Sequence, residues 1–324
     1  MKEKNNPIGS SHEVSIIAPM YNEASNIDRF MYRMIEVMHK LNLDYEFICV
    51  NDGSTDDTLD KLIEYHLQNP RIKIINLSRN FGKEVALTAG LQHSSGKAVI
   101  PIDTDLQDPP EFIEELLAKW REGYDVVYAV RKVRQGEGIV KRLTANLFYR
   151  FINKLSEVPI PKNTGDFRLI DRRVVDHLNK ISERTRFMKG LFAWVGFKQT
   201  GIFYEREPRH SGKSKWNYWK LWNFAIDGIT LFSTGPLKLW SYAGLFISLF
   251  SFIYGSFLLI RTLVIGIAVP GYASIMVTIL FLGGIQLFSL GVLGEYLGRV
   301  YNEVKKRPLY IVRDTYGFQT EHVN

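Results

Sequence analysis

Two aspartates stand two residues apart directly after an apolar stretch. Asp103 and Asp105 follow residues 98–102, and Gln107 and Asp108 come close behind. Carboxylates held side by side repel each other, so the pair favours a bound cation. Oxygen ligands without His or Cys suit Mg²⁺ or Mn²⁺, which also bridges to substrate phosphates. The alternative is a helix N-terminal cluster stabilised by the helix dipole, which is the role expected of Asp108 as an N-cap.

Two more acidic residues follow other apolar stretches. Glu23 comes shortly after residues 14–20, and Asp52 follows residues 47–50. Carboxylates at these positions can accept hydrogen bonds from a base or a ribose. The alternative is local capping, with Asp52 in an Asx-turn and Glu23 near the start of a helix. Both interpretations stay open, and ligand contact is the favoured one.

Short β-branched runs alternate with helical patterns through the first 130 residues. Strands are expected at residues 14–20, 47–50, 72–77, 98–102 and 125–130. Helices are expected between them: one opened by a capping box at residues 25–28, one through residues 59–63, one over 83–92, and one capped by Asp108 with proline at N1. Short connections between alternating strands and helices predict an α/β fold with a doubly wound, mainly parallel sheet.

In such a sheet, ligands bind outside the carboxyl ends of the strands. Polar residues stand at each expected end: Tyr21, Asn22 and Glu23; Asp52; Arg79 and Asn80; Asp103 and Asp105; and Arg131. The pattern therefore predicts one binding site at one edge of the sheet.

Two long uncharged runs, residues 239–260 and 262–294, lie in the last third of the chain. Each half supplies about 20 apolar residues, enough to cross a hydrocarbon core of roughly 30 Å. The alternative is a pair of buried core helices. The connection offers only Arg261, whereas basic residues flank the outer ends, so a transmembrane hairpin with both ends cytoplasmic is expected in the cell (inner) membrane. The flanking residues are Lys213, Lys215, Lys220 and Lys238 before the runs, and Arg299, Lys305, Lys306 and Arg307 after them.

Residues 216–234 carry a narrow polar stripe on a strongly apolar background that includes Trp219 and Trp222. This pattern is typical of an amphipathic helix lying in the membrane interface. The alternative is a helix packed on the globular domain, and one helix could do both.

The composition excludes several classes of protein. The 324 residues hold 46% hydrophobic and 23% charged residues, a net charge of +7, and one cysteine, Cys49. A disulfide-stapled secreted protein and a cysteine-rich zinc protein are thereby excluded. The sequence contains no G-x-G-x-x-G after the first expected strand, no P-loop and no G-x-S-x-G. The basic balance favours anionic partners, and its position beside the apolar runs argues against nucleic acid.

The sequence carries three motifs in order: residues 18–23 (APMYNE), residues 50–56 (VNDGSTD) and residues 103–105 (DTD). Together they resemble the family 2 glycosyltransferases with a nucleotide-sugar-binding GT-A fold. Residues 79–83 (RNFGK), 164–168 (TGDFR) and 209–215 (RHSGKSK) narrow the resemblance to polyprenyl-phosphate glycosyltransferases. These include the bactoprenol glucosyltransferases and, more distantly, the dolichyl-phosphate mannose synthases. The two C-terminal spans are similar to the bactoprenol branch.

The resemblance implies a role for each matching residue. Those implied to contact the nucleotide sugar are Pro19, Tyr21, Glu23, Asp52, Lys83 and Asp103. Asp105 is implied to be a catalytic metal ligand, with Asp103 and Gln107 completing the Mg²⁺ or Mn²⁺ site. The implied donor-phosphate or acceptor-phosphate contacts are Arg131, Arg168, Arg209, Lys213, Ser214 and Lys215. Asp166 falls where inverting members place a catalytic carboxylate.

Asp166 has a second interpretation from acid–base chemistry. A lipid phosphate has its second pKa near 6, so it is a dianionic nucleophile near neutral pH and needs little deprotonation. Asp166 could therefore position the acceptor or an arginine, and a purely structural bond to Arg168 is a further alternative. The basic loop at residues 209–215 could likewise be a solvated linker.

Together these features predict inverting transfer of a hexose, glucose from UDP-glucose before others, to polyprenyl (undecaprenyl) phosphate. There are three alternatives: transfer of mannose or a modified sugar, a processive polysaccharide synthase, and a membrane-anchored nucleotide-sugar sensor. A processive synthase is expected to carry a Q-x-x-R-W motif, which this sequence does not contain. The expected organisation is a catalytic domain over residues 1–210, a basic loop and interfacial helix over 211–236, a hairpin over 237–298 and a cytoplasmic tail over 299–324. A homo-oligomer, with a tetramer as one option, is expected from the aromatic interfacial helix.

Overall fold

A computed structural model describes residues 12–132, 164–181, 183–184, 186, 188–205, 235–265 and 271–318. Its described part contains an eight-stranded mixed sheet in the order β7-β5-β6-β4-β1-β2-β3-β8. The strands are β1 (His12–Met20), β2 (Tyr45–Asn51), β3 (Ile72–Leu77), β4 (Gly96–Pro101), β5 (Val126–Arg131), β6 (Thr164–Asp171), β7 (Gln199–Tyr204) and β8 (Val312–Tyr316). The expected strands at residues 14–20, 47–50, 72–77, 98–102 and 125–130 are confirmed to within about two residues, the usual uncertainty of strand and helix ends.

The sheet is less uniformly parallel than the sequence predicted. Strands β3, β2, β1 and β4 are parallel neighbours. Strand β6 lies between β4 and β5 and is antiparallel to both, and β8 is antiparallel to β3. Because β6 is antiparallel to both of its neighbours, β5 runs in the same direction as β4. The carboxyl ends of β1 to β5 therefore share one edge, as expected, and β6 begins at that same edge.

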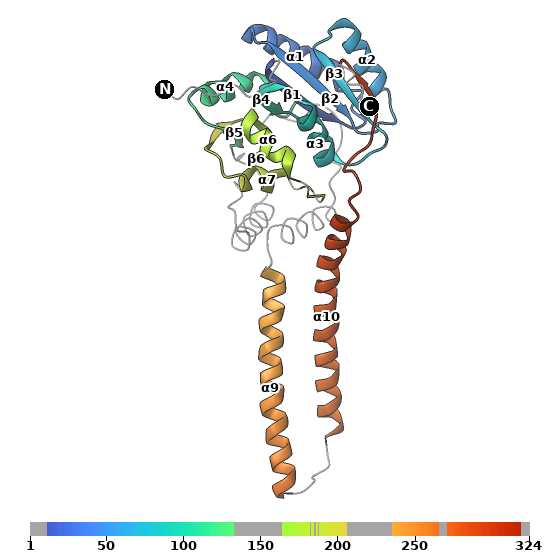
Figure 1. The fold of residues 1–324 in the computed structure, drawn as a ribbon, viewed down its shortest axis with the longest axis vertical. Helices are drawn as coiled ribbons and strands as arrows, with labels where there is room; N and C mark the ends of the chain where they lie inside the picture. The colour runs from blue at the N-terminus through green and yellow to red at the C-terminus, as the bar shows by residue number, and fades with distance from the viewer. Residues whose placement is uncertain are drawn as a thin grey trace.

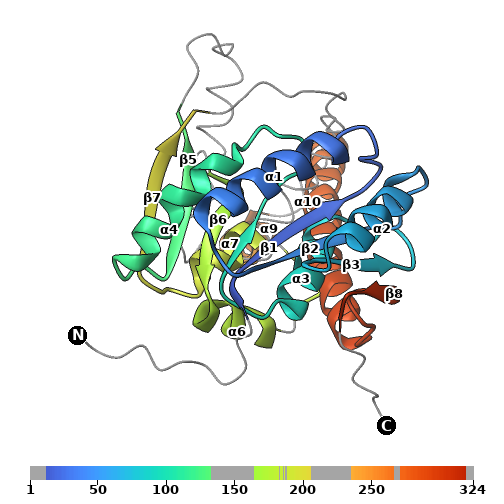
Figure 2. The same ribbon diagram turned by 90° about the horizontal axis from the view of Figure 1, so that it is seen from above.

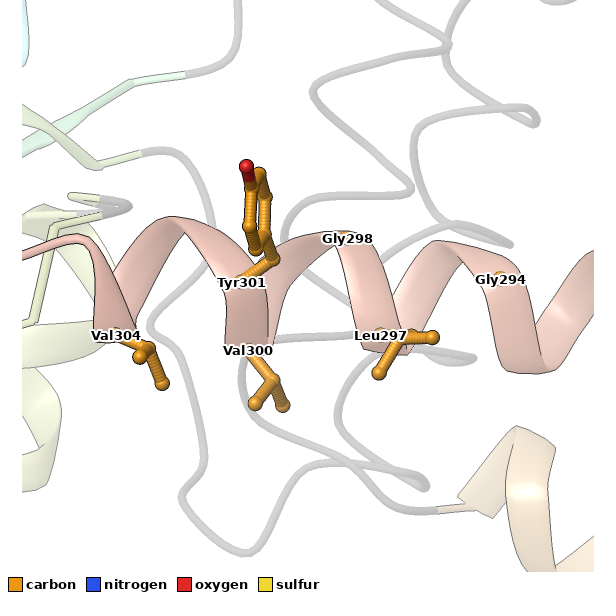
Figure 3. Close-up of a pocket in the computed structure, with 6 residues that line it drawn as sticks. All are labelled: Gly294, Leu297, Gly298, Val300, Tyr301 and Val304. Carbon is orange, nitrogen blue, oxygen red and sulfur yellow. The ribbon is translucent and has the colours of Figure 1, made fainter.

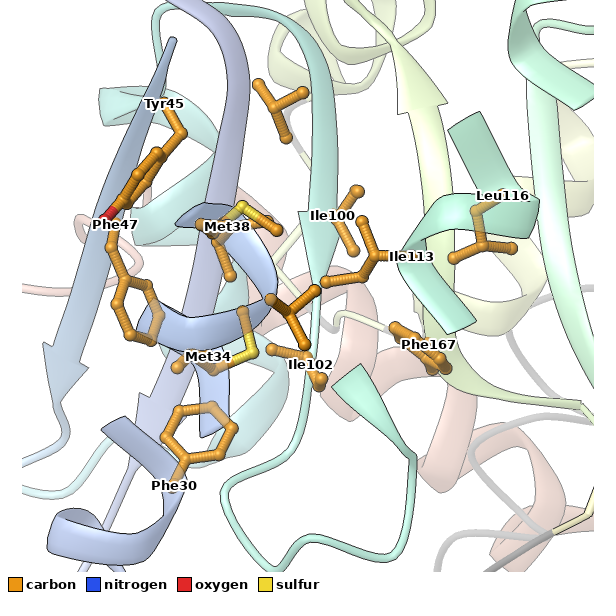
Figure 4. Packing of buried hydrophobic residues seen from close by; sticks show 14 of the residues in the cluster. Phe30, Met34, Met38, Tyr45, Phe47, Ile100, Ile102, Ile113, Leu116 and Phe167 are labelled. Carbon is orange, nitrogen blue, oxygen red and sulfur yellow. The ribbon is translucent and has the colours of Figure 1, made fainter. Parts of the chain in front are cut away.

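Helices cover both faces of the sheet (Figures 1 and 2). One face carries α1 (Ile27–Leu41), α2 (Thr58–Gln68) and α4 (Ile113–Arg121), which follows the short 3₁₀ helix η1 (Pro110–Phe112). The other carries α3 (Lys83–His93), α6 (Arg172–Lys180) and α7 (Met188–Trp194). Successive side chains of a strand point to opposite faces of the sheet, so the sheet has a hydrophobic core on each face. Ile16 belongs to the first core and Ile17 to the second. Figure 4 shows Met34 and Met38 of α1 lying among Phe47, Ile100 and Ile113 in the first core.

Two expected helix caps are wrong. Helix α1 begins at Ile27 and has no side-chain cap, because Asn26 donates its side-chain amide to Glu23 Oε2 at 2.6 Å. Asp28, the other end of the expected capping box, binds Lys61 at 2.5 Å. Asp108 is not an N-cap either: Pro109 takes that position before η1, and proline follows at N1 as predicted.

Helices α9 (Gly235–Ile265) and α10 (Tyr272–Val304) extend away from the sheet domain (Figure 1). The rings of Trp240 and Phe288 lie 4.7 Å apart between them. Among the described residues one stretch, Phe281–Val304, is long and apolar enough to cross a membrane, and Tyr242–Phe257 is a shorter apolar stretch. The second span stays a prediction. Beyond α10 the chain returns to the sheet as β8, an element the sequence analysis did not anticipate.

Candidate active site

The shared edge of the sheet gathers most of the residues singled out by the sequence. Parallel strands bring Glu23, Asp52, Asp103 and Arg131 there from four different strand ends. Asp166 arrives differently, as the third residue of the antiparallel strand β6, whose first residue Thr164 pairs with Val130 near the end of β5. The start of an antiparallel strand and the ends of its parallel neighbours meet at one edge, so Asp166 joins the same site.

Lys83, the first residue of α3, joins two of these carboxylates. Its Nζ atom lies 2.6 Å from Asp103 Oδ1 and 2.5 Å from Asp166 Oδ2. Desolvation lowers the pKa of Lys83, but the two carboxylates outweigh it and raise that pKa well above its usual value. Lys83 is therefore a permanent cation that holds together two carboxylates from separate strands.

Asp166 is a charged group in a buried place. Burial raises its pKa, but the positive charges of Lys83 and Lys189 dominate and hold the pKa of Asp166 far below its usual range. Its Oδ1 atom is buried and has no hydrogen-bond partner among the described residues. A buried unpartnered oxygen is costly unless a ligand or solvent satisfies it, so Oδ1 offers an acceptor to whatever occupies the site.

Glu84 and Lys189 are two further titratable side chains beside Asp166. Desolvation and the charge of Asp166 raise the pKa of Glu84 to about 7, and Glu84 Oε2 accepts a hydrogen bond from the backbone N–H of Met188 at 3.2 Å. Desolvation lowers the pKa of Lys189. We call Lys83, Glu84, Asp103, Asp166 and Lys189 the charge cluster.

Arg168 stands behind this cluster. It is 4% exposed, donates to the Gly165 carbonyl at 2.7 Å, and stacks on the ring of Phe192 at 4.0 Å. Desolvation lowers its pKa to about 10. The structure thus places Arg168 as a support for the turn that presents Asp166, and its expected contact with acceptor phosphate stays a prediction.

The residues expected to hold a metal are close in the chain. Asp105 Oδ1 accepts from the backbone N–H of Gln107 at 3.1 Å, and buried Leu106 between them has a left-handed φ of 57°. No group of three or more His, Cys, Asp or Glu residues is close enough to hold a metal in the part of the chain that the structure describes. Asp103 and Asp105 nevertheless fit Mg²⁺, which commonly takes one or two carboxylates together with substrate phosphates.

The loops after β1, β2 and β3 form the second part of the site. We call residues 20–23, 51–55 and 78–82 the hydrogen-bonded rim. Asp52 accepts from the backbone N–H groups of Phe81 at 2.7 Å and Gly82 at 2.9 Å. Burial raises the pKa of Asp52 despite these bonds. Gly53 has a φ of 63°, and a Cβ there would lie 2.4 Å from the Arg79 carbonyl carbon, so only glycine allows the two loops to touch.

The loop after β1 is held in the same way. Asn22, at a left-handed φ of 54°, donates its backbone N–H to Ser54 Oγ at 3.0 Å and accepts from the Thr55 N–H at 2.8 Å. The backbone N–H of Glu23 donates to Thr58 Oγ1 at 2.9 Å. Tyr21 is 36% exposed and Pro19 is half-buried. The side chain of Glu23 accepts a hydrogen bond from Asn26 Nδ2 within its own turn, and α1 has no side-chain cap. Contact of Glu23 with a ligand stays a prediction.

A chain of amide hydrogen bonds connects the hydrogen-bonded rim to β8. The backbone N–H of Ser54 donates to Asn51 Oδ1 at 3.3 Å, and Asn51 Nδ2 donates to Asn76 Oδ1 at 2.9 Å. Asn76 Nδ2 in turn donates to Asp314 Oδ2 at 2.9 Å. The strand that follows α10 thus contacts, through two buried asparagines, the loop that carries Asp52.

Arg131 is positioned by two residues that the sequence analysis did not connect with it. Its Nε donates to the Tyr204 hydroxyl at 3.2 Å, and its Nη2 lies 4.0 Å from Asp108 Oδ1. The Tyr204 hydroxyl donates to buried Asp108, which replaces the cap role predicted for that residue. Gly165 leaves room for the guanidinium, because a Cβ there would lie 2.6 Å from Arg131 Nη2. Arg131 is therefore directed along the backbone beside Asp166.

Some expected residues cannot be placed, and some placed residues were not expected. Arg209, Lys213, Ser214 and Lys215, with the interfacial helix at residues 216–234, lie outside the described residues. The sequence analysis missed Glu84, Lys189 and Tyr204. Glu84 follows Lys83 directly and could have been noticed; the positions of Lys189 and Tyr204 depend on how α7 and β7 pack.

The sequence relationships decide the family. Residues 15–178 match the family described as Glycosyl transferase family 2, and residues 235–300 match the GtrB C-terminal hairpin. The chain belongs to glycosyl transferase family 2. The mixed α/β sheet accordingly has a GT-A-like fold, and the protein is a glycosyltransferase.

Several relatives match over almost their whole length. An uncharacterized glycosyltransferase of Synechocystis sp. is 61% identical, over 95% of this chain and 96% of that one. An SfII prophage-derived bactoprenol glucosyl transferase of Shigella flexneri is 47% identical, over 94% and 98%. A prophage bactoprenol glucosyl transferase homolog of Escherichia coli is 46% identical, over 93% and 98%. These relationships agree with the family that the sequence motifs resemble.

Proposed function

We propose that the protein transfers a hexose, glucose from UDP-glucose, to polyprenyl phosphate with inversion at the anomeric carbon. The observation that carries the proposal is the charge cluster, in which Lys83 joins Asp103 and Asp166 beside Arg131. The names of the relatives at 46–47% identity support this donor sugar and this acceptor.

The reaction forms one bond and breaks one. An oxygen of the lipid phosphate attacks the anomeric carbon, and the bond from that carbon to the nucleoside diphosphate breaks. Negative charge grows on the departing diphosphate, so fixed cations near it lower the barrier. Arg131 and Lys83 are the described cations at the edge of the sheet that suit this role. We place the nucleoside at the hydrogen-bonded rim, against Asp52, Tyr21 and Glu23, with Pro19 of β1 beside it.

Asp166 is assigned a positioning role. A general base works best when its pKa lies near the working pH, whereas the pKa of Asp166 is held far below its usual range by Lys83 and Lys189. The phosphate dianion needs no base. Asp166 instead fixes the ammonium group of Lys83 through a 2.5 Å ion pair.

A divalent ion is part of the proposal. Asp105 and Asp103 would hold Mg²⁺ or Mn²⁺, with Gln107 as a further ligand, and the bound ion would act as a Lewis acid on the diphosphate. Asp105→Ala and chelation by EDTA are each expected to abolish transfer while the melting temperature changes little. Full activity in chelator, with metal absent by elemental analysis, would contradict the metal requirement.

We place the enzyme in the cell (inner) membrane with both ends of the α9–α10 hairpin cytoplasmic, working as a homo-oligomer. The orientation is tested with single cysteines, since Cys49 is fully buried. Gly271→Cys, between the helices, should react with an impermeant thiol reagent added outside intact cells. Arg313→Cys, on β8, should react only after lysis. Labelling in the reverse pattern would refute the orientation.

The transfer itself is tested with purified full-length protein, undecaprenyl phosphate and a panel of radiolabelled nucleotide sugars. Labelled lipid extracted after incubation with UDP-glucose is the expected result. Label from a different nucleotide sugar would correct the donor. No labelled lipid from any donor, with the protein still folded, would refute the function.

A further inference from the structure

A small cavity lies where α10 meets the catalytic domain. Its volume is about 170 Å³, and its polar lining is Arg184, Asn302, Lys305 and Arg307. Its apolar lining is Val85 of α3, Pro308 and Leu309. We call it the cationic pocket. The lining contains three cations and no carboxylate, which is the composition of an anion site.

Among the described residues, none of the three cationic side chains forms an ion pair. The carboxylate of Glu303 accepts a hydrogen bond from the backbone N–H of Arg184 at 2.6 Å. The Arg184 guanidinium donates to the carbonyls of Glu303 at 3.2 Å and Arg307 at 2.8 Å. It thereby caps the C-terminal end of α10, where cations are favoured, and its remaining N–H groups stay available.

An apolar groove adjoins the cationic pocket along α10. Figure 3 shows its residues, with Tyr301 directed to one side of the helix and Leu297, Val300 and Val304 to another. Gly294 and Gly298 leave the helix surface open between them. We call these six residues the α10 groove. Lys305 lines the pocket, and its ammonium lies 3.9 Å from the ring centroid of Tyr301, which lines the groove. The two features therefore share a border.

A ligand with an anionic head and an apolar chain matches both features at once. Free phosphate would use the pocket alone and gain nothing from the groove. The pocket also lies at the end of Phe281–Val304, the apolar stretch long enough to span a bilayer. We propose that the cationic pocket and the α10 groove bind one anionic phospholipid of the surrounding membrane, separate from the acceptor lipid.

The test uses the full-length protein in neutral detergent and follows its melting temperature, so it needs no sugar transfer. Short-chain phosphatidylglycerol is the probe, with phosphatidylcholine of equal chain length, inorganic phosphate and short-chain polyprenyl phosphate as separate arms. Phosphatidylglycerol is expected to raise the melting temperature with saturation, whereas phosphatidylcholine and inorganic phosphate are not. Polyprenyl phosphate, which binds at the acceptor site, should add its own rise when phosphatidylglycerol is already saturating. Failure of the proposed transfer reaction would leave this result unaffected.

Matched variants locate the site. Arg307→Ala keeps the backbone carbonyl that Arg184 uses, and should raise the half-saturating lipid concentration about tenfold, as expected for loss of a charge-assisted hydrogen bond. Lys306→Asn removes the same charge one residue away and outside the pocket; Asn suits the left-handed φ of 49° at that position. It should change the value less than about twofold, the scale of an exposed charge.

The groove has its own variant. Nothing lies within 4 Å of the position a Cβ would take at Gly298, so Gly298→Leu fills the groove without a clash and should also weaken lipid binding. Equal effects of Lys306→Asn and Arg307→Ala would show that the lipid is attracted by the overall positive charge and not by the cationic pocket, which would overturn the proposal. A matching response to inorganic phosphate, displacement of phosphatidylglycerol by polyprenyl phosphate, or no response to phosphatidylglycerol would each overturn it as well.

Discussion

The two parts of the site are built by different forces. The hydrogen-bonded rim is held by bonds between backbone and side chains, such as those from Phe81 and Gly82 to Asp52. The charge cluster is held by ion pairs in which Lys83 joins Asp103 and Asp166. Hydrogen bonds of this kind fix loop shape, whereas the charges of the cluster also set one another's protonation.

The difference predicts how each part responds to change. Breaking one bond in the rim leaves the others in place, so the loops should shift slightly and binding should weaken. Removing one charge from the cluster leaves buried opposite charges without compensation, which is far more costly. Variants in the cluster should therefore affect the rate strongly, and variants in the rim should affect donor affinity moderately.

The largest effect is expected from Lys83→Met. Two carboxylates would lose their shared cation, and the developing charge on the leaving group would lose a stabilising partner. The ratio kcat/KM should fall by about 10²–10³, the scale for losing one electrostatic contact in an active site. Lys73→Met is the matched control, because it breaks an ion pair with the fully buried Glu46 away from the site. Activity of the Lys83 variant within about threefold of wild type, well below that scale, would refute the cluster's role.

Asp166→Asn should have a smaller effect. The amide keeps the size and one acceptor oxygen for Lys83 but cannot take up a proton. A positioning residue predicts a loss of about tenfold, with an unchanged pH profile that rises through about pH 6 and levels above roughly 7. A loss of about 10²-fold or more, with donor and lipid still bound normally, would identify Asp166 as a base.

The hydrogen-bonded rim was more predictable from the sequence than the charge cluster. Each rim residue follows its own strand, so the local pattern of an apolar run and a polar end suffices to place Asp52 or Glu23. Asp166 needs knowledge of a strand inserted antiparallel between β4 and β5. Its motif drew attention through a family resemblance, but the 2.5 Å contact with Lys83 depends on the packing of the sheet.

The wrong caps have a similar cause. Asp108 has the residue type and the following prolines of an N-cap, but Tyr204, 96 residues further along the chain, supplies a competing partner. Strand β8 gave little signal because its five residues, VRDTY, include three exposed polar ones. It is a strand because β3 offers an unpaired edge, which no pattern local to β8 can indicate.

A smaller effect is expected from the tail strand. Asp314→Ala removes the acceptor for Asn76 and so loosens the amide chain that ends at Ser54. The KM for the nucleotide sugar should rise about fivefold, within the range for one typical intramolecular hydrogen bond, while kcat and the KM for the lipid stay nearly constant. Asp314→Asn keeps an acceptor oxygen and should restore the wild-type value.

Arg313→Ala is the control for that prediction, because it removes the 3.7 Å ion pair to Asp314 and leaves the bond to Asn76. If Arg313→Ala raises the donor KM as much as Asp314→Ala does, the amide chain is not the connection. An equal loss of kcat and donor affinity in Asp314→Ala would indicate general disorder of the sheet edge.

The protonation of the charge cluster should show in the pH dependence of the protein's stability. Glu84 has a pKa of about 7 in the folded protein and 4.5 as an ordinary side chain, chiefly because burial and then Asp166 disfavour its charge. Between pH 4.5 and 7 the folded state therefore holds a proton on Glu84 that the unfolded state has lost, and stability falls as pH rises through that window.

Glu84→Gln removes this loss of stability and keeps an acceptor for the Met188 N–H. The variant should gain on wild type by up to about 1.4 kcal/mol per pH unit from pH 4.5 to 7, measured by chemical denaturation in detergent. The same substitution at exposed Glu114 should leave the pH dependence unchanged. Parallel curves for Glu84→Gln and wild type would show that the cluster does not hold that proton, and the charges around Asp166 would then be less tightly coupled than the contacts of Lys83 imply.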